Sequence, residues 1–117
     1  MIGTKILATA TVAFVFSSSA LACVTFKGST GVHIYVNDNV SGSSVQTCSD
    51  AMKYGDQDAD CISGYSLNYD YSDNGYSSFP ITYCNNQACS SIDVPYTGDC
   101  TNHADACAFD YTFGGDC

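Results

Sequence analysis

Eight cysteines in a chain of 117 residues constrain this sequence more than any other feature. They are Cys23, Cys48, Cys61, Cys84, Cys89, Cys100, Cys107 and Cys117. No two of them have the Cys-x-x-Cys spacing of a zinc site, and in an exported chain an even number of cysteines predicts disulfides. A small domain buries little apolar surface, so we expect these bridges to stabilise the fold. The sequence leaves their pairing open.

The first residues have the pattern of an export signal. Lys5 precedes an apolar run over residues 6–16, and Ala20-Leu21-Ala22 is a small-residue cleavage site before Cys23. The run is too short to span a bilayer, which needs about 20 apolar residues. Lipidation of Cys23 would leave an odd number of cysteines, so we expect simple cleavage. We therefore predict a signal peptide over residues 1–22, a single secreted domain over residues 23–117, and no stable membrane insertion.

The charge of the chain is strongly negative. All 12 acidic residues are Asp, and the predicted mature part keeps only Lys27 and Lys53, which gives 2 − 12 = −10. Nucleic acid is excluded as a partner, because a phosphate backbone needs clustered Lys and Arg.

Apolar and polar residues alternate with a period of two, which predicts an all-β fold. The expected strands are, by residue number, 32–36, 44–48, 65–71, 79–84, 91–96 and 107–113. About seven short strands favour a β-sandwich. We expect most aromatic rings to fill its core, with Tyr54, Tyr76 and Tyr96 exposed in turns.

Three local features add detail to this outline. Pro80 and Pro95 predict sheet edges or strand starts, because proline cannot donate to a ladder. The acidic loop over residues 50–60 is expected to contain a helical turn at Ala51-Met52-Lys53, capped by Ser49 or Asp50.

Two further patterns occur in a familiar order. The first is Tyr35-Val-Asn-Asp-Asn-Val-Ser-Gly42-Ser-Ser44, in which Gly42 can supply the positive φ of a tight hairpin. The second is Asp73-Asn74-Gly75-Tyr76-Ser77-Ser78. Together they resemble the Greek-key motif of the βγ-crystallin superfamily, although Val40 stands where that family has an aromatic residue. Asn74-Gly75 is also an ordinary hairpin-turn signal.

The resemblance implies a Greek-key β-sandwich and a structural Ca²⁺ site. It implies that the Ser77 hydroxyl and the Gly75 carbonyl are ligands, with Asp73 and Asn74 shaping or joining the site. Such oxygen-only groups suit calcium. It also implies that the folded hairpin at Gly42 docks beside the Asp73–Ser78 corner.

Small secreted members of that superfamily include effector and toxin-like proteins. We therefore expect a non-enzymatic, monomeric protein that binds an extracellular protein or cell-surface target. One alternative is a protease inhibitor presenting residues 80–88 or 93–99 as a rigid loop, and a less favoured one is a small hydrolase using His103 and Asp105. Asn39-Val40-Ser41 is a glycosylation sequon, usable in a eukaryotic source.

Overall fold

The computed structural model describes residues 23–72, 77–86, 88–98, 100 and 106–114, and over these residues it contains strands and no helix. The predicted signal peptide lies outside them. The strands are β2 (Val24–Ser29), β3 (His33–Val40), β4 (Ser43–Asp50), β5 (Gln57–Asp58), β6 (Asp60–Cys61), β7 (Tyr65–Tyr69), β8 (Ser78–Asn85), β9 (Ala88–Pro95) and β10 (Ala108–Phe113). The all-β prediction is confirmed, although the sequence did not indicate β2, β5 or β6.

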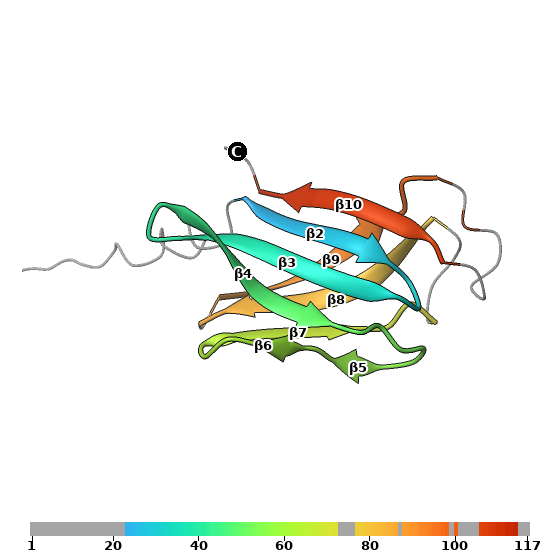
Figure 1. Cartoon of the computed structure of the whole chain (residues 1–117), viewed down its shortest axis with the longest axis horizontal. Coiled ribbons are helices and arrows are strands. Elements are labelled where there is room, and N and C mark those ends of the chain that lie inside the picture. Colours follow the sequence, from blue (N-terminus) through green and yellow to red (C-terminus); the bar gives the residue numbers. More distant parts are fainter. Residues whose placement is uncertain (1–22, 73–76, 87, 99, 101–105, 115–117) are drawn as a thin grey trace, which may run out of the picture.

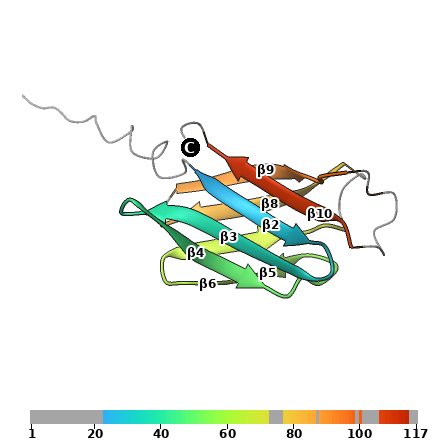
Figure 2. The same ribbon diagram turned by 45° about the horizontal axis from the view of Figure 1, so that its top comes forward.

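The strands form two antiparallel sheets that face each other (Figures 1 and 2). One has the order β10-β2-β3-β4-β6 and the other the order β5-β7-β8-β9. Hairpins join most neighbours in sequence, while β10 returns from the end of the chain to pair with β2. A bridge between Tyr96 and Phe109 links the β9 side to β10.

The core lies between the sheets and is rich in aromatic rings, as the alternation predicted. Phe26 and Tyr83, from opposite sheets, meet edge to face with ring centroids 5.7 Å apart. Phe79 and Phe109 do the same at 5.0 Å. Such rings remove large apolar areas from water, and edge-to-face pairs add about 0.5–1.5 kcal/mol each beyond that burial.

Three disulfides join neighbouring segments of the sandwich. Cys48–Cys61 links β4 to β6 and Cys84–Cys89 links β8 to β9, while Cys100–Cys107 closes the connection towards β10. Cys23 is disulfide-bonded as well, and Cys117 lies outside the described residues. The molecule is thus a disulfide-rich, two-sheet domain over the part of the chain that the structure describes.

Three local expectations were wrong. Residues 51–53 are irregular chain and form no helical turn. Tyr96 is buried, because its ring stacks on Phe79 and its backbone bridges to Phe109. Tyr54 is exposed as predicted, and Tyr76 lies outside the described residues.

The third error concerns Pro80, which lies inside the central strand β8. Its carbonyl accepts a hydrogen bond from the Asp70 N–H, just beyond the last β7–β8 pair, Tyr69 with Ile81. In an antiparallel ladder, the N–H and C=O of one residue point towards the same neighbouring strand. Proline has no N–H, and at Pro80 the missing hydrogen bond would be made at a position where β7 has already ended. Pro95 does end the edge strand β9, as expected.

The Gly42 turn does not lie beside the segments that flank the predicted Asp73–Ser78 corner, residues 73–76 of which are outside the described residues. Gly42 has a φ of 86° in the tight β3–β4 turn, as its position predicted. The turn lies near the end of β8, where Asn85 Nδ2 donates to Asp38 Oδ2, whereas the end of β7 and the start of β8 lie at the opposite end of the sandwich (Figure 1). Docking of the hairpin on this corner is therefore corrected: β3 and β4 pair along their length within one sheet, and their turn lies at the other end of the sandwich.

Candidate binding site

One segment closes the sandwich along an edge, and we call residues 54–62 the rim. Its first strand, β5, pairs with β7, and its second, β6, pairs with β4 of the other sheet. Along the rim the even-numbered residues are exposed and the odd-numbered ones are half-buried. The exposed row consists of Tyr54, Asp56, Asp58, Asp60 and Ile62. Successive side chains of an extended chain point to opposite sides, so Asp58 and Asp60 share one face, whereas Tyr54 precedes the bend at residues 54–56, where Gly55 has a φ of 96°.

A neutral amide holds two of the rim carboxylates in place. Asn68 Nδ2 donates to Asp56 Oδ1 at 2.7 Å and to Asp58 Oδ1 at 3.0 Å. It also lies 3.2 Å from the Gln57 carbonyl. The partner is an amide and not a cation, so it orders the two carboxylates without pairing them with a positive charge. This edge therefore carries an ordered row of acidic side chains, which the exposed Lys53 precedes in the chain.

The two ends of the row are apolar and unusually exposed. Tyr54 is 60% exposed, and its ring meets Tyr71 edge to face with centroids 5.4 Å apart. Burial raises the pKa of Tyr71, and the neighbouring Tyr54 raises it further, so this ring stays neutral. Ile62, at the other end, is 46% exposed. Exposed aromatic and aliphatic side chains at fixed positions are the usual anchors of protein-binding surfaces.

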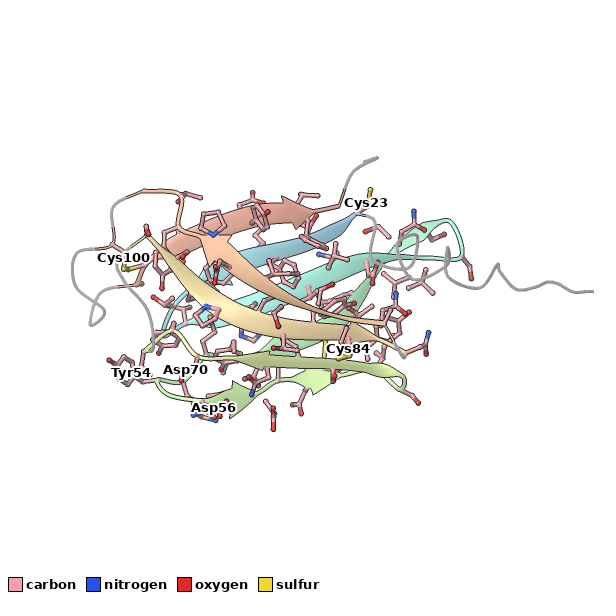
Figure 3. The ribbon with its side chains drawn as sticks, turned by 180° about the vertical axis from the view of Figure 1, so that it is seen from behind. Cys23, Tyr54, Asp56, Asp70, Cys84 and Cys100 are labelled. Carbon is pink, nitrogen blue, oxygen red and sulfur yellow. A yellow bond between two sulfur atoms is a disulfide. The ribbon has the colours of Figure 1, made fainter. Side chains whose placement is uncertain are left out.

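A groove opens on each side of the rim. The first, of about 230 Å³, lies on the β7–β8 side and is lined by Asp56, Asn68, Asp70, Pro80, Ile81 and Thr82. Tyr54, Asp56 and Asp70 lie together at one end of this edge (Figure 3). The second, of about 220 Å³, lies on the β4 side over the Cys48–Cys61 disulfide and includes Ser49, Asp60 and Ile62.

A polar aromatic pair extends the second groove across the outer face of β3 and β4. His33 Nε2 lies 2.8 Å from Ser49 Oγ. The His33 and Tyr35 rings stack with centroids 4.4 Å apart, and Tyr35 pairs across the sheet with Ser49. Ser49 in turn pairs with Asp60 of the rim. The exposed surface from Tyr35 to the rim is therefore continuous.

The predicted calcium residues give a mixed picture. Asp73, Asn74 and Gly75 lie outside the described residues, and Ser77 is exposed, with its carbonyl accepting the Tyr96 N–H at 2.9 Å. Among the described residues, no group of three or more His, Cys, Asp or Glu side chains is arranged to hold a metal ion.

The other predicted residues can be placed briefly. Asn39 is exposed beside the β3–β4 turn, where its side-chain oxygen accepts the Gly42 N–H at 3.0 Å. His103 and Asp105 lie outside the described residues. Within the described ranges no helix is long and apolar enough to cross a membrane.

Residues 50–60 were expected to form an acidic loop, and the sequence did not reveal the rim. The alternation of Asp56, Asp58 and Asp60 with half-buried residues was the available signal, because it has the period of a strand.

The fold and this edge define a disulfide-stabilised, all-β domain with an exposed acidic rim. Comparison with known proteins adds no family to that description: no family model, no curated protein and no solved structure matches the chain.

Proposed function

We propose that this protein is a secreted, non-enzymatic effector or toxin-like protein that binds an extracellular protein or cell-surface target through the rim. Three disulfides fit an extracellular protein. The observation that carries the proposal is the exposed row that starts at Tyr54 and ends at Ile62, with a groove on each side. Bridges that fix such a surface before contact lower the entropic cost of binding.

A paired experiment tests this function. The secreted, oxidised protein is applied to panels of candidate target cells, and growth, death and surface binding are measured. The double variant Tyr54→Ser/Ile62→Ser should lose the effect, while Ser44→Ala, exposed near the far end, should keep it. Absence of any effect or binding on every panel would remove the proposal.

The βγ-crystallin-like Greek key belongs to this proposal as its architectural part. Its support is the tight turn at Gly42 and the spatial order β10-β2-β3-β4, in which a later strand returns beside the first of three hairpin-linked strands. Other β-sandwich families share this Greek-key order, so the superfamily assignment stays a prediction.

Calcium is the proposed structural ion, and its site rests on residues 73–77 alone. Calcium that binds only the folded state should raise the midpoint of thermal unfolding by mass action. We expect Asp73→Ala and Ser77→Ala to reduce this rise, and Asp93→Ala, exposed on β9, to leave it unchanged. Differential scanning calorimetry with and without CaCl₂ measures the effect. If calcium leaves the unfolding midpoint of the wild-type protein unchanged, residues 73–78 do not form a calcium site.

One observation keeps the protease-inhibitor alternative open. Residues 80–85 belong to the central strand β8 and cannot project as a loop. The hairpin tip that follows is clamped by Cys84–Cys89, however, and Asn86 at this tip is exposed with a positive φ of 56°. A protease panel with no inhibition at micromolar protein concentration would eliminate this alternative.

A further inference from the structure

The chemistry of the rim indicates the kind of partner it accepts. We propose that the rim and its β7–β8 groove dock a basic polypeptide segment in an extended conformation, with Lys or Arg at alternate positions. This inference rests on the proposed binding function and specifies its partner.

Charge complementarity is the first reason. The chain has 12 acidic residues against 3 basic ones, and no basic residue occurs between residues 54 and 62. The exposed carboxylates of Asp56, Asp58 and Asp60 therefore create a negative potential along one edge. A partner with the opposite charge is attracted before contact and held in register after it.

The spacing of the row is the second reason. The exposed rim residues recur every second position, which in extended chain is about 6.6–6.8 Å. An extended partner presents its own alternate side chains at the same interval. Three cationic side chains at alternate positions can thus each face one carboxylate, whereas the same charges on a helix or in a contiguous block cannot.

The groove beside the rim provides a place for one of these cations. Asp56 and Asp70 supply carboxylates, Thr82 a hydroxyl and Pro80 an apolar ring. Arg and Lys pack their aliphatic stems on apolar surface while the charged head is paired at the tip. The planar guanidinium of Arg also matches a carboxylate in a two-point hydrogen bond, so we expect Arg to be preferred over Lys here.

The exposed ring of Tyr54 provides a second contact that also favours Arg over Lys. A guanidinium placed over a tyrosine face is attracted by the negative face of the ring. The edge contact with Tyr71 fixes the orientation of Tyr54 before the partner arrives. Hydrogen bonds from Asn68 likewise fix the orientation of the Asp56 and Asp58 carboxylates. The surface is therefore ordered in advance, which reduces the entropy lost on binding.

Fluorescence polarisation with three labelled peptides tests the proposal. The first alternates Arg with Ser, the second has the same composition with all Arg in one block, and the third alternates Glu with Ser. The alternating Arg peptide should bind most tightly and should weaken as NaCl increases. Equal binding of the block peptide would overturn the extended register, and no binding of either Arg peptide would overturn the proposal.

Isosteric variants locate the contact. Asp56→Asn, Asp58→Asn and Asp60→Asn should each weaken the alternating peptide about two- to fivefold, as expected for exposed ion pairs. Asp110→Asn, exposed on β10 of the other sheet, is the matched control and should change the affinity less. Equal losses in the rim variants and in this control would mean that only net charge matters, and the rim would be rejected. Circular dichroism checks that each variant is folded.

A final experiment distinguishes failure of the basic-partner inference from failure of the proposed binding function. The triple variant Asp56→Asn/Asp58→Asn/Asp60→Asn is compared with Tyr54→Ser/Ile62→Ser on cells that respond to the wild-type protein. If the triple variant keeps its effect while the apolar variant loses it, the basic partner is wrong and the binding function stands. Loss in the triple variant supports both.

Discussion

Asp38 lies in the core, 1% exposed, with no cation among its hydrogen-bond partners. Its carboxylate accepts hydrogen bonds from the Tyr83 hydroxyl at 2.8 Å, from Asn85 Nδ2 at 3.1 Å and from the Asn39 N–H at 2.7 Å. A buried carboxylate is tolerated only when its oxygens are hydrogen-bonded. Thr47 completes the network at 2.9 Å from the Tyr83 hydroxyl, so the contact ties β3 and β4 to β8 across the two sheets.

This network gives the first prediction at the scale of single residues. Tyr83→Phe removes the hydroxyl that reaches both Asp38 and Thr47 while keeping the ring. We expect the free energy of unfolding to fall by about 1–3 kcal/mol, the cost of leaving buried polar groups unpaired. Urea denaturation of the oxidised protein measures it. Tyr35→Phe, on an exposed ring, is the control, and equal effects of both changes would contradict the prediction.

Tyr69 gives a second prediction, on pH. Burial, and then the acceptor Asp50, raises its pKa from 10.0 to about 12, although the Lys53 N–H acts in the opposite direction. The folded state therefore holds this proton more tightly than the unfolded state does. The resulting stability is fully present below pH 10 and is lost as the pH rises towards 12.

The measurement is a set of urea unfolding curves at several pH values from 9 to 12. Burial raises the pKa of Tyr83 even further, so that group contributes to the same decline. Tyr69→Phe should make the decline shallower. A decline of unchanged steepness in this variant would show that Tyr69 is not its source.

At the scale of elements, two of the disulfides join directly paired residues of neighbouring strands. Cys48 pairs with Cys61 between β4 and β6, and Cys84 pairs with Cys89 between β8 and β9. The strands β5 and β6 have two residues each, so few ladder hydrogen bonds hold the rim. The Cys48–Cys61 bridge therefore fixes the edge that carries the proposed binding row.

Removing the Cys48–Cys61 and Cys84–Cys89 disulfides one at a time measures how much each of them stabilises the fold. A disulfide stabilises partly by restricting the unfolded chain, and the restriction grows with the length of the closed loop. The sequence separations are 13 for Cys48–Cys61 and 5 for Cys84–Cys89. We expect Cys48→Ala/Cys61→Ala to cost about 3 kcal/mol and Cys84→Ala/Cys89→Ala about 2 kcal/mol in urea denaturation. The reverse order would mean that the rim is held by other contacts.

Over the whole molecule, like charges oppose compaction. The chain has a formal net charge of −9, and the predicted mature part reaches −10. Folding brings the Asp side chains closer together than in an expanded chain, so their repulsion lowers stability. Exposed charges are screened by salt, so this cost depends on ionic strength.

Thermal unfolding at two salt concentrations tests whether repulsion between the Asp side chains lowers stability. Raising NaCl from about 10 mM to about 150 mM shortens the screening length from about 30 Å to about 8 Å. We expect the unfolding midpoint to rise, and to rise less in the variant Asp56→Asn/Asp58→Asn/Asp60→Asn. A midpoint that stays constant or falls with salt would show that repulsion is not a significant cost.

The sequence by itself determined the class of the fold and most of its core. Period-two alternation located six of the strands and placed Leu67, Tyr69 and Phe109 on buried faces, because burial of one strand face is a local property of the pattern. The positive φ at Gly42 was also predictable, since it follows from the local geometry of a two-residue turn.

Only the tertiary structure decided which segments meet. Alternation tells which residues share a face, but strand pairing depends on contacts between residues far apart in the chain, which leave no mark on a single segment. That is why the Gly42 turn was expected beside the Asp73–Ser78 corner, yet the end of β7 and the start of β8, which flank that corner, lie at the other end of the sandwich from the turn. For the same reason, the short strands of the rim were taken for a loop: each has only two residues, and they become strands because β7 and β4 lie on either side of them.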